Sequence, residues 1–152
     1  MSEINYKRAN KEDIEELMKV RLEMLREVND LPDDYEYDEV IVNESKKYFE
    51  TGDQTTILAF DGQKVVGCAS LSYIWVMPTF SHPTGKRAHL MNVYTHKQYR
   101  RRGISKKMVE LLIEGAKENG VTEINLDATA MGRPLYEALG FAASDSCMVM
   151  EL

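Results

Sequence analysis

The feature that most constrains the fold is a change of hydrophobic period across a basic turn. The segment HLMNVY, residues 89–94, alternates as a half-buried strand does, and the turn HKQYRRRGIS follows it. From Ser105 onward the apolar residues recur on one face of a helix: Val109, Leu112, Ile113 and Ala116. Asn119-Gly120 predicts the end of that helix. A strand that enters a helix through a short turn indicates layers of helix against sheet.

The rest of the chain extends this arrangement in both directions. Strands are predicted over 4–8 and 124–128 and in the two runs that flank Asp61-Gly62, a strong hairpin signal. Helices are predicted from Asn10 to about residue 28, over 40–49 with an end near Gly52, and briefly after Pro134. Cys147–Leu152 predicts a final strand. The order β-α-α-β-β-β-α-β-α-β predicts one α/β (α+β) domain over residues 1–152, with a mostly antiparallel sheet.

Composition excludes several classes of protein. No apolar run approaches the roughly 20 residues of a membrane helix, and the N-terminus lacks a secretory apolar region, so we expect a cytoplasmic protein without a membrane partner. The 152 residues carry a net charge of −6. Nucleic-acid binders present a net basic face, so we expect no nucleic-acid partner. Cys68 and Cys147 lack metal-ligand spacing and are expected to be reduced and buried.

The basic turn from Arg100 to Ser105 has the character of an anion site. Backbone N–H groups at a helix start have no internal partners, and the helix dipole adds positive potential there. Gly103 allows a close approach of backbone to ligand, so we expect a pyrophosphate cradle. A solvated basic loop capped by Ser105 is the alternative. The glycine patterns of the Walker A loop and of the dinucleotide-binding fingerprint are both absent.

Two motifs resemble those of the GNAT superfamily, the GCN5-related N-acetyltransferases. Arg100, Gly103 and Ser105 occupy the positions of the signature Arg/Gln-x-x-Gly-x-Gly/Ala, and RPLYEALGF matches the downstream Leu-Tyr and Gly-Phe of the family. The predicted element order agrees over nearly the whole chain. The resemblance implies a GNAT-like sheet whose strands 4 and 5 splay apart to hold acetyl-CoA, the acetyl donor.

The resemblance also assigns residues to acetyl-CoA by position. Residues of the central strand would lie along the pantetheine arm and acetyl group: Val93, Tyr94 and Thr95. Residues of the turn would surround the pyrophosphate: Arg100, Arg101, Arg102, Gly103, Ile104, Ser105 and Lys106. Ser105 replaces the usual Gly or Ala, and its hydroxyl is expected to donate to the phosphate rather than crowd it. Thr129 stands where many members have an Asn that contacts the cofactor, so the resemblance assigns Thr129 to the cofactor as well.

The resemblance places Tyr136 beside the CoA sulfur, so Tyr136 is the expected general acid for the leaving thiolate. A phenol with a pKa of about 10 is protonated at neutral pH; a core aromatic is the alternative. A backbone N–H near Val93 or Tyr94 would polarise the carbonyl. Glu123, Asp127 and His96 are candidates for the general base, and none of them is assigned to it. Asn92 cannot act as a base.

The acceptor is expected to be the amine of a small molecule or peptide. The acidic stretch DLPDDYEYDE spans residues 30–39. The resemblance places this stretch beside the acceptor site, where it would attract a cationic amine. An exposed acidic loop is the alternative. His82, His89 and His96 recur every seven residues. The odd separation puts His89 and His96 on opposite faces of a strand, so no metal site is expected.

These observations favour an acetyl-CoA-dependent N-acetyltransferase that works by direct attack in a ternary complex. A CoA-binding regulatory module without catalysis is the first alternative. A nucleic-acid-binding domain that uses Arg100 to Arg102 is the second and is less favoured, because the chain is acidic and lacks an aromatic platform. A homodimer is left open, and no surface is assigned to it.

Overall fold

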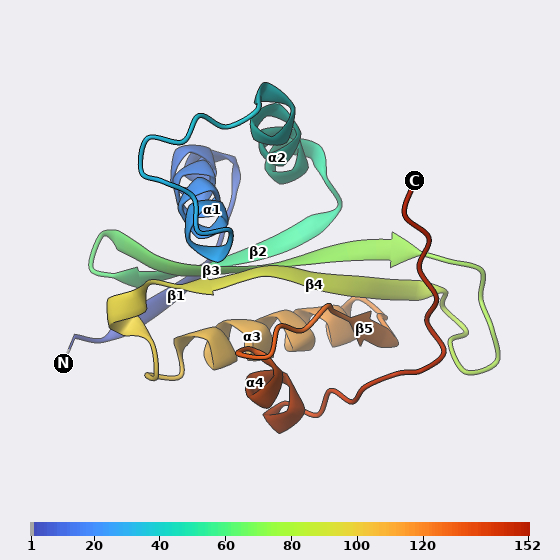
Figure 1. The fold of residues 1–152 in the computed structure, drawn as a ribbon. Helices are drawn as coiled ribbons and strands as arrows, with labels where there is room; N and C mark the ends of the chain where they lie inside the picture. The colour runs from blue at the N-terminus through green and yellow to red at the C-terminus, as the bar shows by residue number, and fades with distance from the viewer. Residues whose placement is uncertain (1) are drawn as a thin grey trace.

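A computed structural model describes residues 2–152 and shows a mixed sheet covered on both faces (Figure 1). The five strands lie in the order β1-β2-β3-β4-β5. They are β1 (Ile4–Arg8), β2 (Gln54–Asp61), β3 (Lys64–Trp75), β4 (Lys86–Thr95) and β5 (Glu123–Asn125). Neighbouring strands are antiparallel except β4 and β5, which are parallel. The predicted fold class is confirmed.

The helices form a layer on each side of the sheet. On one face lie α1 (Ile14–Val28) and α2 (Glu39–Thr51), and on the other lie α3 (Ile104–Glu118) and α4 (Arg133–Ala138) (Figure 1). Single 3₁₀ turns, η1 (Lys11–Asp13) and η2 (Lys97–Tyr99), precede α1 and follow β4. No helix within residues 2–152 combines the length and the apolarity needed to cross a membrane.

Each face of the sheet has its own apolar core. The α3 face buries side chains of β2, β3 and β4 against the apolar stripe predicted for the helix, including Leu71, Leu90, Met108, Val109 and Leu112. The α1 and α2 face buries a smaller set, including Leu17, Val20, Phe49, Leu58 and Tyr94. Alternation along the strands divides these residues between the two faces.

The local signals in the sequence mark the element ends correctly. Asn10 and Asp13 form the reciprocal capping box ahead of α1. Gly62 takes a φ of 61° in the hairpin between β2 and β3, and Gly120 takes 78° after α3. Because each signal depends only on neighbouring residues, it can be predicted without knowledge of the tertiary fold.

A β-bulge interrupts β4 at Asn92. Met91 pairs with Ser70 and Tyr94 with Cys68, so Asn92 and Val93 face the single residue Ala69. Asn92 has a φ of 58°, an unusual conformation for a residue other than glycine. The extra residue shifts the in-and-out alternation of β4 in the middle of the sheet.

Strands β4 and β5 separate soon after they meet. Their pairing covers Arg87 to His89 on β4, and β5 ends at Asn125. From Leu90 to Thr95, the edge of β4 that faces away from β3 therefore has no partner strand within the described residues. This is the divergence implied by the GNAT resemblance.

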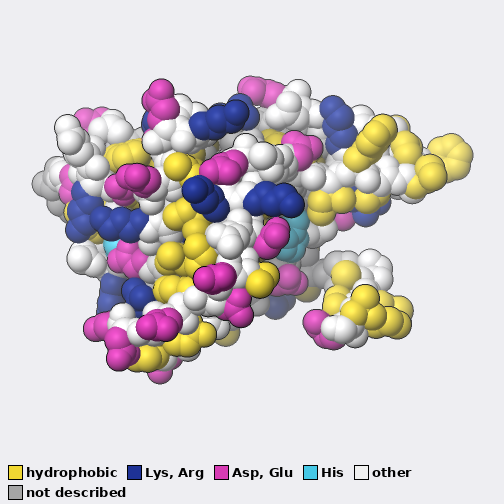
Figure 2. Space-filling model, turned by 90° about the horizontal axis from the view of Figure 1, so that it is seen from above, with side chains coloured by type: hydrophobic (Ala, Val, Ile, Leu, Met, Phe, Trp, Pro, Cys, Tyr) yellow, Lys and Arg dark blue, Asp and Glu magenta, His cyan; other side chains and the backbone are white. Residues whose placement is uncertain are grey.

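The predicted strand over Cys147–Leu152 is wrong. The segment lies outside the sheet, and Met148, Val149, Met150 and Leu152 are each at least 80% exposed. Its apolar residues favour a strand, yet a strand needs a partner, and β5 is only three residues long. In Figure 2 this segment and the β3–β4 connection project from one end of the molecule as two apolar arms.

The two cysteines differ in accessibility, contrary to the expectation that both are buried. Cys68 is buried and Cys147 is exposed. Burial raises the pKa of the Cys68 thiol to about 12, and its Sγ donates to the carbonyl of Asn92 at 3.3 Å.

The native protein is therefore expected to expose a single reactive thiol. An aromatic disulfide reagent at pH 8 should titrate Cys147 rapidly, and Cys68 only after denaturation, because the thiolate is the reactive form. Cys147→Ser removes the fast phase, and Cys68→Ser leaves it intact. A fast phase of two thiols in the wild type would contradict the buried position of Cys68.

Candidate active site

The turn between β4 and α3 presents a run of free backbone donors. Arg101 and Gly103 both have positive φ, 63° and 76°. Left-handed residues in a turn can point successive N–H groups to one side, the arrangement called a nest. Within residues 2–152 no acceptor bonds the backbone N–H groups from Arg101 to Lys106, whereas Lys107 donates to Gly103. The turn can thus bind an anion mainly through its backbone.

The arginine side chains are arranged differently from one another. Arg100 turns back toward α1, where its Nε donates to the Thr95 carbonyl at 2.9 Å and its Nη2 pairs with Glu27. Arg102 donates to the Ser2 carbonyl at 3.0 Å and lies over the Tyr99 ring. Arg101 and Lys106 are exposed and make no ion pair with any residue from 2 to 152. These two can supply positive charge to an anion in the turn.

A buried polar group holds the end of β4 against α1. The Tyr94 hydroxyl donates to Glu27 at 2.6 Å, and Arg100 binds the same carboxylate. Burial, together with the hydrogen bond to Glu27, raises the pKa of Tyr94 well above its ordinary value. Burial alone would raise the pKa of Glu27, but the hydrogen bonds from Tyr94 and Arg100 outweigh it and lower that pKa. Tyr94 and Arg100 thereby position the strand and the turn.

The remaining turn and strand residues join β4 to α3. The hydroxyls of Thr95 and Ser105 lie 2.6 Å apart, so Ser105 bonds within the protein. Ile104 is buried in the core under α3, and Val93 packs against the same core from β4. The donation of Ser105 to a phosphate stays a prediction. A Cβ on Gly103 would meet no atom within 4 Å, so the turn is open on that side.

Tyr136 and Thr129 lie together around α4. Tyr136 packs against Phe141, with ring centroids 5.9 Å apart, and no described residue bonds its hydroxyl. Burial raises the pKa of Tyr136 above its ordinary value, so the phenol stays protonated at neutral pH. Thr129 caps the turn ahead of α4 by accepting from the Gly132 N–H at 3.1 Å. The role of Tyr136 as general acid stays a prediction.

A cavity of about 800 Å³ opens on the other face of β4, between α1, α2 and the segment that joins them. Its β4 wall is formed by Met91 and Asn92, which the bulge brings to the same face. Arg21 of α1 lines the cavity and donates to Asn92 Oδ1 at 3.3 Å. Tyr48 of α2 lines it too, with its hydroxyl 2.7 Å from Ser72 Oγ. The cavity therefore reaches the bulge of β4 from the side of the first two helices.

Only part of the acidic stretch reaches this cavity. Tyr35, Tyr37 and Asp38 line it, whereas Asp33, Asp34 and Glu36 do not. The Asp38 carboxylate caps α2 by accepting from Val40 N–H at 2.8 Å, and the Tyr37 hydroxyl donates to the Leu22 carbonyl. These contacts give the stretch a structural role as the wall of the cavity.

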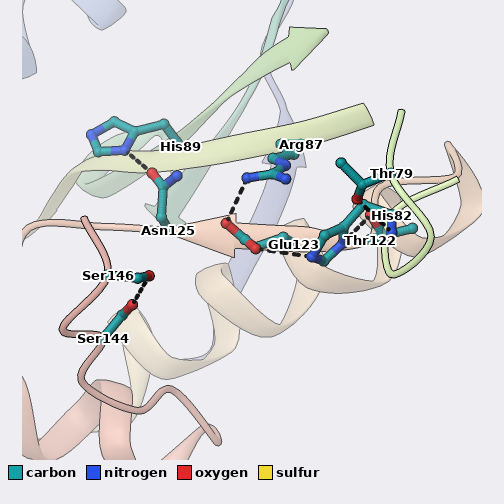
Figure 3. A network of polar contacts seen from close by, with 9 residues as sticks. All are labelled: Thr79, His82, Arg87, His89, Thr122, Glu123, Asn125, Ser144 and Ser146. Carbon is teal, nitrogen blue, oxygen red and sulfur yellow. Dashed lines mark hydrogen bonds and ion pairs between the residues drawn. The ribbon is translucent and has the colours of Figure 1, made fainter. Parts of the chain in front are cut away.

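The histidines take three separate partners. His82 lies 3.2 Å from Glu123, His89 bonds Asn125, and His96 lies 3.2 Å from Glu23 of α1 (Figure 3 for the first two). The expectation of opposite faces for His89 and His96 is wrong, because the bulge at Asn92 shifts the alternation between them. Within residues 2–152 no three His, Cys, Asp or Glu side chains are grouped to hold a metal ion.

Of the candidate general bases, Glu123 is held by other residues and Asp127 does not line the cavity. Glu123 contacts both His82 and Arg87 (Figure 3), and Asp127 is fully exposed. Sequence reasoning missed Arg21 and Glu27, which lie on the polar side of a helix predicted only from its apolar stripe. Their charges carry no local signal, because their partners Asn92 and Arg100 are 71 and 73 residues away.

Comparison with known proteins agrees with this geometry. The sequence profile of the Acetyltransferase (GNAT) family matches residues 14–141, from α1 through the Tyr136 motif. The chain belongs to this family. Membership confirms the acyltransferase class, with acetyl-CoA as the acetyl donor of the family.

Solved structures and a curated relative extend the similarity. A predicted acetyltransferase with acetyl-CoA from Clostridium acetobutylicum has a TM-score of 0.85 and 26% identity, covering 98% of this chain and 96% of that one. A GCN5-related N-acetyltransferase from Ralstonia eutropha has a TM-score of 0.77 and 22% identity, with 99% of each chain covered, and shows the shared fold.

The curated relative is a glucosamine 6-phosphate N-acetyltransferase of Trypanosoma brucei brucei. It is 30% identical over 89 residues, 59% of this chain and 58% of that protein. The match thus spans less than two thirds of the relative.

Proposed function

We propose that this GNAT chain transfers the acetyl group of acetyl-CoA to the amine of a small acceptor by direct attack in a ternary complex. The observation that carries the proposal is the run of unbonded N–H groups from Arg101 to Lys106, at the end of the unpaired edge of β4. A pyrophosphate fits these donors. Arg101 and Lys106 add charge from the rim, and the open side at Gly103 admits the ligand.

The amine would approach from the cavity and the thioester from the gap between β4 and β5. The amine nitrogen forms a bond to the acetyl carbon, the carbon–sulfur bond breaks, and Tyr136 donates its proton to the departing thiolate. The amine proton leaves to solvent, and the Tyr136 phenolate regains a proton from solvent. A backbone N–H at Val93 or Tyr94 would stabilise the developing oxyanion, since the bulge at Asn92 disturbs the regular ladder there. Orientation of both substrates lowers the barrier further.

The alternatives have less support. Arg100 and Arg102, the side chains that a nucleic-acid-binding surface would need, are turned onto Glu27 and Ser2. A CoA-binding module without catalysis would not require a free phenol at Tyr136 or a cavity of about 800 Å³ against β4. A homodimer stays a prediction.

Selective stabilisation by acetyl-CoA is the expected result of the first test. At about a hundred times its Kd a ligand adds roughly 2.7 kcal/mol of stability, a rise in Tm of roughly 5–10 °C for a chain of this size. Dephospho-CoA, which keeps the pyrophosphate, is expected to stabilise in part, and a short DNA duplex not at all. The absence of a shift with acetyl-CoA at high concentration would reduce the turn to a basic loop and refute the proposal.

A further inference from the structure

Arg21 is a half-buried cation that forms no ion pair with a carboxylate of the described residues. Its guanidinium lines the cavity, and its one described hydrogen bond goes to the neutral amide of Asn92 at 3.3 Å. Within residues 2–152 no carboxylate forms an ion pair with it, whereas Arg87 and Arg100 each face a glutamate. Burial lowers the pKa of Arg21, and the nearby Cys68 and Tyr48 side chains oppose this by raising it.

This arrangement is costly without a ligand. A guanidinium stays protonated in proteins, so burial cannot be relieved by loss of the proton. Arg21 is half-buried, and moving a charge even partly out of water without a counter-charge costs free energy. The planar fork of an arginine also matches the two oxygens of a carboxylate or phosphate.

The position of Arg21 connects the charge to the reaction. Its partner Asn92 lies in the β4 bulge, directly before Val93, whose N–H is proposed to polarise the thioester carbonyl. An anion bound to Arg21 would therefore lie close to an amine positioned to attack the thioester. Met91, Leu25 and Phe49 provide apolar wall around it.

We propose that Arg21 binds an anionic group of the acceptor, so that the substrate is a small amine with a carboxylate or phosphate close to its nitrogen. This inference rests on the proposed acetyltransferase function and refines its acceptor. The expected cationic amine is compatible with this proposal, because an acceptor with a protonated amine and an anionic group is a zwitterion. Arg21 selects the acceptor, and Tyr136 and the backbone N–H groups act on the acetyl group.

The test uses pairs of amines that differ only in the anion. Glucosamine 6-phosphate is compared with glucosamine, and each of several α-amino acids with its amide, by thiol release from acetyl-CoA and by Tm of the CoA-bound protein. The wild type is expected to favour the anionic member of a pair at least tenfold in kcat/KM. Whether phosphate or carboxylate gives the larger preference identifies the anion.

Variants of α1 then assign the preference to Arg21. Arg21→Gln is expected to raise KM for the anionic member about 10- to 100-fold and to leave the neutral member nearly unchanged, because a charge-assisted bond is lost. Arg21→Lys keeps the charge without the fork and should fall between. Lys19→Gln, an equal loss of charge on the exposed side of the same helix, should keep the wild-type preference.

The outcomes separate this inference from the proposed function. Stabilisation by acetyl-CoA with turnover of neutral amines at least as fast as their anionic partners would overturn the role of Arg21 alone. A preference that persists in Arg21→Gln would overturn it too. If Arg21→Gln fails to fold, the wild-type preference and Arg21→Lys still decide. No stabilisation by acetyl-CoA would instead refute the acetyltransferase proposal itself.

Discussion

Replacement of Tyr136 by phenylalanine is expected to lower kcat by roughly 10²- to 10⁴-fold, the range of general acid–base catalysis. The substitution removes a hydroxyl that no described residue bonds, so the packing against Phe141 is retained. Acetyl-CoA affinity should change little, because the contacts proposed for the pyrophosphate and the pantetheine arm lie in β4 and the turn before α3. Steady-state thiol release with an amine identified by screening, together with the Kd of acetyl-CoA, measures both effects.

The pH dependence gives a second measure of the same residue. Because burial raises the pKa of Tyr136 above its ordinary value, the phenol stays protonated through neutral pH. The midpoint of the activity loss on the alkaline side should lie above the ordinary tyrosine pKa of about 10. Tyr73→Phe is a matched control, since the Tyr73 hydroxyl contacts Thr55 at 3.2 Å on β2. A Tyr136→Phe enzyme with wild-type kcat would exclude the general-acid role. A wild-type protein that binds acetyl-CoA but acetylates no amine would favour the CoA-binding module.

The fold could be predicted where its signals are local. The capping box at Asn10, the hairpin glycine at Gly62 and the exit glycine at Gly120 each fix a chain direction through neighbouring residues. The change of hydrophobic period before α3 also predicted that a helix packs against the sheet as a separate layer. Together these define the element order, and burial of the apolar faces then leaves few ways to assemble them.

Two features of the fold depend on distant partners and could not be predicted. The bulge at Asn92 appears only when β4 is paired with β3, because an extra residue is defined relative to the opposite strand. The segment Cys147–Leu152 has the composition of a strand but finds no strand to pair with among the described residues. Hydrophobic alternation indicates what a segment could bury, and pairing decides whether it does.

The candidate site divides in the same way. Gly103 and the helix start predict a backbone anion site, because a positive φ and unbonded N–H groups are properties of the local chain. The direction of the Arg100 side chain is set by Glu27, 73 residues earlier, and the sequence gives no sign of this pair. Arg21 was likewise hidden, since its significance lies in the absence of an ion pair with any residue from 2 to 152, although Asp38 and Glu44 line the same cavity.

Gly103 offers the sharpest test of the backbone cradle, because an aspartate there should oppose the pyrophosphate directly. A Cβ at this position meets no atom within 4 Å, and Asp and Asn are the residues other than glycine that best tolerate its φ of 76°. Two unit charges about 6 Å apart repel by ~1–3 kcal/mol for an effective dielectric between 80 and 20. Gly103→Asp is therefore expected to weaken acetyl-CoA binding by roughly 10- to 100-fold, measured by calorimetric titration at low salt.

Gly103→Asn separates charge from shape in this experiment. It adds a side chain of the same size and the same backbone cost but no charge, so acetyl-CoA affinity should fall only a few-fold. Stability should change in the opposite sense, because a carboxylate at the start of α3 interacts favourably with the helix dipole by ~0.3–1 kcal/mol. The aspartate variant should thus melt at or above the temperature of the asparagine variant while binding acetyl-CoA more weakly. Equal affinities for the two variants would mean that the pyrophosphate lies elsewhere, and the anion-binding role of residues 101–106 would have to be abandoned.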